Sequence, residues 1–482
     1  MDAELVKHYL TDRSRLGPPF AGGFDGAAGG APCGDLVRIS LELDGGVIAR
    51  TSFDAEGCAT ARAAAAATAE LAEGATVLEA GLVGPQELAE ALGGVGPQGR
   101  HAVELAADAL ARALAALAGS DRELAGPPAG SERVLVALSG GVDSAVAALR
   151  ERERGAEVIA VTLKLWADRR TDAERSCCSP TAVLGARALA HGLGIPHLTL
   201  DLEPQFRRQV VGSFVEGYRS GRTPNPCVVC NGELRIDAMV ALADRLGCAA
   251  LATGHYARVA DDGEGPLLRA AADPAKDQSY MLSGLRPATL ARLRFPLAEL
   301  RKPQVREIAA AAGLPVAGKA ESQDLCFLAG EGKRSFLARH GGLRERPGAI
   351  VDRAGRTLGE HGGYHEFTVG QRRGLGAGGG PQPRYVLATD AASNTVVVGS
   401  REELATRRVA MRDATLHRPG GRVDRVLLRY HSRPMGCTAP PVGAGVHERL
   451  ELELAEPAYG VAPGQTACLL SGDIVVGRAT IA

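Results

Sequence analysis

The stretch "RVLVALSGGVDSAVAAL", residues 133–149, decides the fold of the central part of this chain. Its first residues form a short apolar run, which predicts a buried strand. Its last residues are rich in alanine with apolar positions at helical spacing, which predicts a helix. Two glycines and two serines fill the joint between them. We therefore expect a strand that turns tightly into a helix, as in the parallel sheets of α/β proteins.

The turn at residues 137–144 has the chemistry of a phosphate-binding loop. Backbone N–H groups and the positive end of a helix attract an anion, and glycines let the backbone approach it closely. Ser139 and Ser144 add hydroxyl donors, and Asp143 is placed to hold Mg²⁺ on the phosphates. The loop lacks the G-x-x-x-x-G-K-[ST] pattern of a Walker loop. The plainer alternative is an ordinary turn with a serine N-cap.

The loop resembles the PP-loop of ATP pyrophosphatases, which cleave ATP to AMP and pyrophosphate while they adenylate a carbonyl-type oxygen. Five further motifs follow in chain order: "GRTPNPCVVCN" (221–231), "ATGHYAR" (252–258), "KDQSYML" (276–282), "ESQDLCFL" (321–328) and "TVGQRRGLG" (368–376). With the loop, they resemble the tRNA-specific 2-thiouridylases from residue 131 to the end. The resemblance implies thiolation of the wobble uridine of tRNA, in which ATP adenylates O2 and sulfur displaces AMP.

The same resemblance implies roles for individual residues. It implies a catalytic nucleophile at Cys230 and a persulfide at Cys326. It implies contacts to the nucleotide, ATP with Mg²⁺, at Ala137, Leu138, Ser139, Gly140, Gly141, Val142, Asp143, Ser144, Leu163 and Gly254. It implies contacts to tRNA at Asn225, Pro226, Cys227, Lys276, Asp277, Gln278, Arg429 and Tyr430.

Cys227 departs from the best-known form of this family, which has Asp three residues before the nucleophile. Under a thiol mechanism, Cys326 carries a persulfide and Cys230 resolves it. Under a cluster mechanism, Cys227, Cys230 and Cys326 bind a [4Fe-4S] cluster with one open iron. A third alternative makes Cys227 only a small buried residue beside the catalytic pair.

The N-terminal segment carries a second resemblance. "GGAPCGD" (29–35) and "FDAEGCATARA" (53–63) resemble the NifU/IscU scaffolds of iron-sulfur cluster assembly. The resemblance implies cluster ligands at Cys33, Asp35, Cys58 and His101. Ala102 stands where those scaffolds have a further cysteine, so a domain kept only for docking is the alternative. A flexible linker would raise the effective concentration of this domain at the thiolation site, with a cysteine desulfurase or other sulfur donor as partner.

Length and composition predict a multidomain chain, because 482 residues exceed what one core usually holds. The Gly- and Pro-containing segment "GSDRELAGPPAGSE" (119–132) separates the first domain from the rest. Alternating strand and helix patterns follow, and glycine-punctuated strands end the chain. We expect an α+β NifU/IscU-like domain (1–120), a linker (121–132), an α/β PP-loop domain (133–330), a small central module (331–402) and a C-terminal antiparallel β-barrel (403–482).

Charge and hydropathy limit the partners. With 55 basic and 56 acidic residues, a tRNA surface must be local. Residues 401–433 hold nine arginines against four acidic residues, and Arg372 and Arg373 add two cations; ordinary solvated arginines are the alternative reading. The absence of a long apolar run and the charged start predict a cytoplasmic protein without a membrane partner. Two other functions stay open, another PP-loop adenylating enzyme and an iron-sulfur scaffold or sulfur carrier without catalysis.

Overall fold

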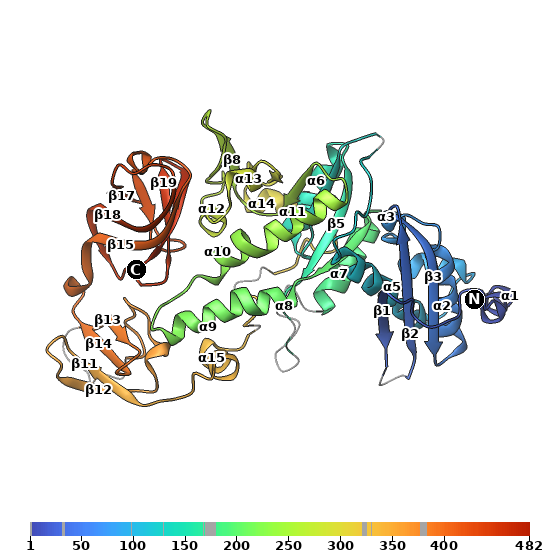
Figure 1. The fold of residues 1–482 in the computed structure, drawn as a ribbon, viewed down its shortest axis with the longest axis horizontal. Coiled ribbons are helices and arrows are strands. Elements are labelled where there is room, and N and C mark those ends of the chain that lie inside the picture. The colour runs from blue at the N-terminus through green and yellow to red at the C-terminus, as the bar shows by residue number, and fades with distance from the viewer. Residues whose placement is uncertain are drawn as a thin grey trace.

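The computed structural model describes residues 2–30, 34–97, 99–128, 130–166, 168, 180–320, 325–328, 330–375 and 383–482. The N-terminal domain lies at one end of the long axis, the parallel-sheet domain in the middle and the β-barrel at the other end (Figure 1). The predicted fold class is confirmed, with a small β module between the last two domains. Within the described ranges, no helix has the length and apolarity needed to cross a membrane.

The N-terminal domain is an antiparallel sheet covered by helices. Its strands, in sheet order, are β1 (Phe24–Gly29), β2 (Leu36–Asp44) and β3 (Val47–Glu56). Its helices are α1 (Ala3–Thr11), α2 (Ala59–Ala72), α3 (Val77–Ala80), α4 (Pro85–Ala91) and α5 (Arg100–Ala118). Most alanines of α2 are buried, and α2 packs against β3 and α5. The alanine run therefore makes a close-packed core without large side chains.

The central domain contains five parallel strands. Their sheet order is β10 (Leu293–Arg294), β7 (Ala250–Thr253), β4 (Arg133–Ala137), β5 (Glu157–Lys164) and β6 (His197–Asp201). The α-helices are α6 (Val142–Glu153), α7 (Pro180–Gly192), α8 (Glu203–Phe206), α9 (Gly212–Arg219), α10 (Pro226–Cys230), α11 (Ile236–Arg245), α12 (Ser279–Leu282), α13 (Pro287–Leu290), α14 (Lys302–Ala311) and α15 (Lys333–Gly341). Two π-helical turns, η2 (Arg207–Val211) and η3 (Asn231–Arg235), lie between them. Because β4 is the middle strand, the loop after it lies at the carboxyl edge where such sheets bind ligands.

The rest of the chain is β structure. The small module has the sheet order β12 (Thr357–His361), β11 (Gly348–Val351), β14 (Thr395–Gly399) and β13 (Tyr385–Asp390). The barrel strands are β15 (Ala405–Leu416), β16 (Arg425–Leu427), β17 (Met435–Thr438), β18 (Gly445–Tyr459), β19 (Thr466–Ser471) and β20 (Ile474–Ile481). Antiparallel pairing of β15 with both β18 and β20 closes the barrel.

A hairpin from the central segment joins the barrel sheet. Its strands are β8 (Arg258–Asp261) and β9 (Pro266–Arg269), and β9 pairs with β20. Arg418 of the barrel, 4% exposed, donates to both carboxylate oxygens of Asp262 at 2.6 and 3.0 Å. Arg422 also donates to Asp262, at 3.1 Å. Two of the nine arginines in residues 401–433 therefore fix this hairpin through Asp262.

The segment between the first two domains is packed against the central domain. Leu124 is fully buried, and the N–H groups of Leu124 and Ala125 donate to the Arg245 carbonyl oxygen at 2.8 and 3.1 Å. The Arg245 guanidinium donates to the Ala118 carbonyl oxygen at the end of α5, at 2.8 Å. An apolar side chain and backbone hydrogen bonds therefore anchor the part of this segment around Leu124 and Ala125.

The N-terminal domain also contacts the edge of the parallel sheet directly. Helix α5 packs against β6, the last strand of that sheet. The His197 N–H of β6 donates to the Gly81 carbonyl oxygen at 2.9 Å, and Arg187 of α7 donates to Asp108 of α5 at 2.9 Å. A sheet edge exposes unpaired backbone groups, and here the neighbouring domain covers part of it.

Candidate active site

The loop after β4 is stabilised by its own polar groups. The Ser144 hydroxyl donates to the Gly141 carbonyl oxygen (3.0 Å) and accepts the Ser139 N–H (3.1 Å). A hydroxyl has one proton, so the 3.1 Å contact between the two serine hydroxyls has Ser139 as donor. Gly140 has φ +68°, a left-handed conformation that favours glycine. Ser144 therefore shapes the loop from within.

Gly254 provides the close approach that a nucleotide site needs. It follows β7, which pairs with β4. A Cβ at this position would lie 2.7 Å from the Ser144 nitrogen and 2.8 Å from the Asp143 carbonyl carbon. Only glycine fits there, so the match of Gly254 to a nucleotide-contacting position has a steric basis. Leu163 lies near the carboxyl end of β5, at the same edge of the sheet.

Asp143 is held by side chains from two distant segments. The Lys302 ammonium lies 2.7 Å from both Asp143 carboxylate oxygens, and the Tyr256 hydroxyl donates to one of them at 2.8 Å. Lys302 is the first residue of α14 and is 8% exposed. In this structure Asp143 is the ion-pair partner of Lys302, and its two carboxylate oxygens keep further lone pairs for other ligands.

A buried histidine supports the loop from behind. The Thr162 hydroxyl donates to the Leu138 carbonyl oxygen at 2.7 Å and lies 2.8 Å from His197 Nε2. Because the Thr162 proton is used on Leu138, His197 Nε2 must be the donor in the second bond. Burial, with the nearby positive charge of Arg187, lowers the pKa of His197 to about 3, so the ring is neutral. His197 also contacts Gly81, which links the N-terminal domain to the loop.

The thiolation segment forms a short helix with a defined start. The Asn225 side-chain oxygen accepts the Cys227 and Val228 N–H groups at 3.2 and 3.4 Å, so Asn225 is the N-cap of α10. Pro226 occupies the first helical position and is buried. Cys230 is buried and Cys227 half-buried. The two cysteines are thus at opposite ends of one helical turn.

The barrel reaches this segment. The Tyr430 ring lies 5.8 Å from the Tyr280 ring of α12, and the Tyr280 hydroxyl donates to the Thr466 carbonyl oxygen of the barrel at 2.9 Å. Burial raises the pKa of Tyr430, and the nearby charges of Asp277 and Cys227 raise it further. Residues predicted to contact tRNA from three segments therefore converge.

Gln465 strengthens the same junction. Its side-chain amide donates to the Thr223 carbonyl oxygen at 2.8 Å, and the Thr223 N–H donates to the Pro463 carbonyl oxygen at 2.8 Å. A Cβ at Gly464 would lie 2.9 Å from the Arg222 Cβ. The loop before β19 is therefore closely packed on the "GRTPNPC" segment.

The "KDQ" residues, 276–278, lie in a turn that Asp277 and Gln278 stabilise with hydrogen bonds. The Asp277 carboxylate accepts from the Ala271 N–H at 2.9 Å and from the Ser279 hydroxyl at 2.7 Å. Gln278 exchanges hydrogen bonds with the Tyr256 backbone at 2.9 and 3.0 Å. Lys276 is half-buried in the same turn. Since Tyr256 bonds to Asp143, this turn is connected to the phosphate-binding loop.

Several arginines are exposed and have no acidic partner among the described residues. Arg372, Arg373 and Arg429 are exposed, and no carboxylate of the described chain forms an ion pair with them. Arg412, by contrast, pairs with its neighbour Asp413. The first three are the better candidates for phosphate contacts.

Of the three cysteines predicted to act together, Cys230 is buried and Cys227 and Cys326 are half-buried. Cys230 is part of the main core cluster, and Cys326 packs against that cluster. Two groups of metal-ligating side chains in the described residues have ligand atoms within 4.8 Å of one another, and Cys227, Cys230 and Cys326 are not one of them. A single ion therefore does not fit these cysteines, whereas a four-iron cluster would bind each thiolate on a separate iron.

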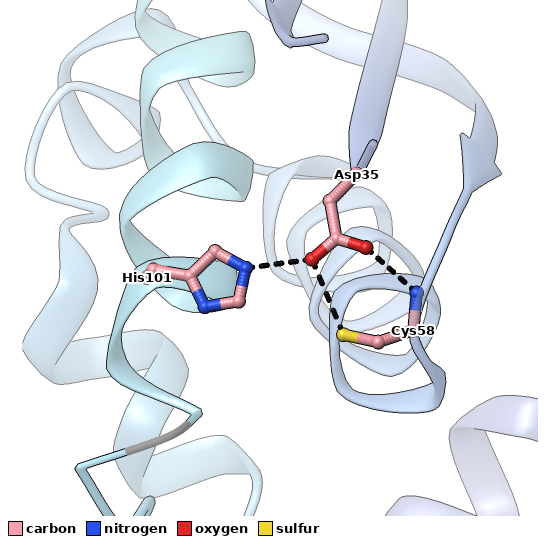
Figure 2. Close-up of side chains that lie close together, drawn as sticks. All are labelled: Asp35, Cys58 and His101. Atoms are coloured by element: carbon pink, nitrogen blue, oxygen red, sulfur yellow. Dashed lines mark hydrogen bonds and ion pairs between the residues drawn. The ribbon is translucent and has the colours of Figure 1, made fainter. Parts of the chain in front are cut away.

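The first of those groups is the predicted N-terminal site. The Asp35 carboxylate lies 2.6 Å from His101 Nε2 and accepts the Cys58 N–H at 2.7 Å and the Cys58 thiol at 3.3 Å (Figure 2). Hydrogen bonds from the Cys58 backbone and from His101 hold the pKa of Asp35 below its usual value. Sulfur, nitrogen and oxygen donors suit a transition metal. Cys33 lies outside the described residues, and Ala102 is fully buried.

The second group is an ion-pair network. Asp168, Glu331 and His340 lie together, and Arg339 contacts both carboxylates. Arg339 already neutralises these acids, so the group carries no metal assignment.

The sequence patterns did not indicate several residues that contact the candidate site. Lys302 and Lys319 approach the loop from more than 150 positions further along the chain, and Gln465 comes from the barrel. Tyr256 and Tyr280 were inside quoted motifs, but nothing in their spacing indicated their partners. These contacts join segments that are far apart in the sequence, so no local pattern indicates them.

Comparisons with known families match four models along the chain. They are a NifU-like N terminal domain (residues 12–123), a tRNA methyl transferase HUP domain (132–330), a tRNA methyl transferase PRC-barrel domain (334–400) and an aminomethyltransferase beta-barrel domain (421–481). Two of these descriptions mention methyl transfer to tRNA, whereas the cysteines of the site suit sulfur chemistry.

The names of similar proteins decide between methyl transfer and sulfur transfer. A bifunctional protein NifU/MnmA of Rubrobacter xylanophilus is 46% identical over 99% of this chain and 98% of its own length. The tRNA-specific 2-thiouridylases MnmA of Acidithiobacillus ferrooxidans and Deinococcus radiodurans are 44% and 42% identical over 72% and 73% of this chain, and over 97% and 92% of their own lengths. The chain therefore belongs to the bifunctional NifU/MnmA family, in which a NifU-like domain is fused to the domains of a tRNA-specific 2-thiouridylase.

Proposed function

We propose that this enzyme uses ATP to adenylate O2 of the wobble uridine in tRNA and then replaces that oxygen with sulfur. The predicted tRNA 2-thiouridylase activity is confirmed by family membership, which disfavours both a small-molecule adenylating enzyme and a scaffold without catalysis. The chemical route and the roles of individual residues are our proposal.

The adenylation step suits the loop at residues 137–144. The uridine O2 attacks the α-phosphorus of ATP, the new O–P bond forms, and the bond from the α-phosphorus to the β-phosphate oxygen breaks with its electron pair on pyrophosphate. The backbone N–H groups at the start of α6 would hold the phosphates, and the steric fit at Gly254 supports that cradle. Mg²⁺, when bound with ATP, would neutralise phosphate charge.

The sulfur step suits Cys326 and Cys230. The terminal sulfur of a Cys326 persulfide attacks C2 of the adenylated uridine, and AMP leaves with the former O2. The Cys230 thiolate then attacks Cys326 Sγ, the S–S bond breaks with its electrons on the sulfur attached to C2, and a Cys230–Cys326 disulfide forms. The Cys230 thiolate is thereby oxidised to a disulfide sulfur, and the terminal sulfur of the persulfide is reduced to the sulfur that stays on C2. A thiol reductant and a sulfur donor, such as a cysteine desulfurase, restore the enzyme.

A [4Fe-4S] cluster on Cys227, Cys230 and Cys326 is the second mechanism, and the presence of Cys227 favours it. With three protein thiolates, a cluster supplies one iron that is open to sulfide. Cys227 and Cys326 are half-buried and Cys230 is buried, and this degree of exposure is compatible with a cluster at the edge of the core.

Iron counts on the full chain, purified without oxygen, separate the two mechanisms. The cluster mechanism predicts that Cys227→Ala loses about four irons per chain relative to the parent, with loss of thiolation. The matched variant Cys58→Ala reports any iron held by the N-terminal site. If Cys227→Asp thiolates tRNA normally and Cys227→Ala changes no iron count, the persulfide mechanism holds.

The N-terminal site would hold a metal or an iron-sulfur cargo through Asp35, Cys58 and His101. These residues come together, and their donor types fit such a cargo. We propose that the domain receives sulfur or iron from a partner while docked on the central sheet. The packed segment at Leu124 argues against a freely moving carrier.

The observation that carries the proposed function is the contact of Tyr430 from the barrel with Tyr280 of α12, a helix that packs against α10 and its two cysteines. The test is mass-spectrometric detection of 2-thiouridine in tRNA incubated with enzyme, ATP and a sulfur donor. Cys230→Ser and Cys326→Ser should lose the product, whereas Cys437→Ser, on β17 of the barrel, should keep it. Full thiolation by Cys326→Ser would overturn the assignment.

A further inference from the structure

The phosphate-binding loop has no cation of its own. Residues 137–144 read ALSGGVDS, without Lys or Arg. When pyrophosphate leaves, negative charge grows on the departing β-phosphate oxygen, and enzymes stabilise such charge with a prearranged cation. The side chain that supplies it must come from another part of the chain.

Among the described residues, the ammonium groups that contact the loop belong to Lys302 and Lys319, both from the segment around α14. Lys302 contacts both carboxylate oxygens of Asp143 at 2.7 Å. Lys319 donates to the Gly140 carbonyl oxygen at 2.8 Å. Lys302 is 8% exposed, whereas Lys319 is exposed. Lys302 therefore contacts a carboxylate and is shielded from solvent, whereas Lys319 contacts a carbonyl oxygen and is exposed to solvent.

The difference decides which lysine can bind phosphate. Lys302 is committed to a carboxylate, so moving it to a phosphate would leave Asp143 without its counterion. Lys319 contacts a neutral carbonyl, and exchanging that contact for a phosphate oxygen replaces an ordinary hydrogen bond with a stronger, charge-assisted one. An anion in the loop would therefore draw Lys319 more readily than Lys302.

The backbone that carries Lys319 is held in place. Arg306 of α14 donates to the Ala317 carbonyl oxygen at 2.9 Å and to the Lys319 carbonyl oxygen at 3.3 Å. The Lys319 N–H donates to the Val316 carbonyl oxygen at 3.0 Å. Little backbone ordering remains to be done when the ammonium meets a phosphate.

We propose that Lys319 binds the β- and γ-phosphates of ATP and stabilises the departing pyrophosphate, while Lys302 is a positioning residue that orients Asp143. The proposal rests on the adenylation route described above. Lys319 also stands on the same segment as Cys326, so a nucleotide that binds Lys319 fixes the chain seven positions before the sulfur-bearing cysteine.

The test compares product inhibition by pyrophosphate and by AMP in the full chain, with tRNA-dependent AMP formation as the assay. Lys319→Ala should raise the inhibition constant for pyrophosphate by about ten- to hundredfold, the loss expected for one charge-assisted hydrogen bond. The constant for AMP should not change, because AMP lacks the β- and γ-phosphates. Lys319→Arg should recover part of the loss, and Lys7→Ala, on the exposed face of α1, is the matched control.

The outcomes separate this inference from the proposed function. If the parent enzyme forms no AMP with tRNA, the adenylation route itself fails. If the parent forms AMP and Lys319→Ala keeps the parent's inhibition constant for pyrophosphate, only the role of Lys319 is refuted. Equal weakening of pyrophosphate and AMP in Lys319→Ala would show a structural effect and would also refute that role.

Discussion

One ion pair across the boundary between the first two domains gives a quantitative prediction. Arg187 of α7 donates to Asp108 of α5 at 2.9 Å, and their side chains are 9% and 22% exposed. Asp108 also accepts from Arg112, on its own helix, at 2.8 Å, and the Arg112 side chain is 60% exposed. The two arginines thus share one carboxylate, but only Arg187 crosses the boundary.

The structure sets the size of the effect. Arg187→Ala removes a nearly buried, charge-assisted hydrogen bond. We expect this change to destabilise the interface by about 1.5 kcal/mol, the low end of the usual range, because Asp108 keeps its contacts with Arg112 and with some water. Because 1.4 kcal/mol is a factor of ten, the opening of the interface should become about ten times more frequent. Arg112→Ala breaks an exposed pair four residues apart, so about 0.3–0.5 kcal/mol and a twofold change are expected.

Hydrogen–deuterium exchange at His197 measures this opening. The His197 N–H donates to Gly81 across the boundary, so its exchange reports local separation of the domains. We expect exchange about ten times faster in Arg187→Ala and about twice as fast in Arg112→Ala. Asp108→Ala combined with Arg187→Ala should add little to Arg187→Ala alone. Equal exchange in the two arginine variants would refute the docked arrangement.

Three further predictions follow from the site. Tyr256→Phe removes one hydrogen bond to Asp143, so tRNA-dependent AMP formation should fall about three- to tenfold. The dissociation constant for tRNA should not change, and a matching loss of tRNA affinity would contradict this role. Arg429→Ala should lower the slope of log K against log salt for tRNA binding by about one, whereas the paired Arg412 should leave the slope unchanged when replaced by Ala. Hydrogen bonds hold the pKa of Asp35 below its usual 3.8, so its stabilising contribution is present above that pH and is lost on acidification. The melting temperature of Asp35→Asn should therefore fall less than that of the parent between about pH 6 and 3. Identical profiles of melting temperature against pH would disprove the contribution.

The sequence alone determined the features that depend on neighbouring residues. The strand, turn and helix around Ser139 are encoded within one short stretch, because the apolar run, the glycines and the alanine-rich helix are local signals. Family motifs also indicated Asp35, Cys58 and His101 as candidate ligands, and the fold brings their ligand atoms within 4.8 Å of one another.

In two segments, the amino-acid composition did not indicate the tertiary contacts that the segment makes. The Gly- and Pro-containing segment at 119–132 has the composition of a free linker, but the burial of Leu124 and two backbone hydrogen bonds to Arg245 fix it. Likewise, the arginine count of residues 401–433 did not reveal that Arg418 is 4% exposed and paired with Asp262.

Only the tertiary structure decided which charges meet at the loop and which domains share the thiolation site. Lys302 and Lys319 lie far along the chain from Asp143 and Gly140, and the Tyr430 ring packs against Tyr280 of another domain. Such partners leave no periodic signal, since their contact depends on how strands, helices and the barrel pack. Local propensities determine the elements, whereas the burial of apolar surface between elements determines which side chains meet.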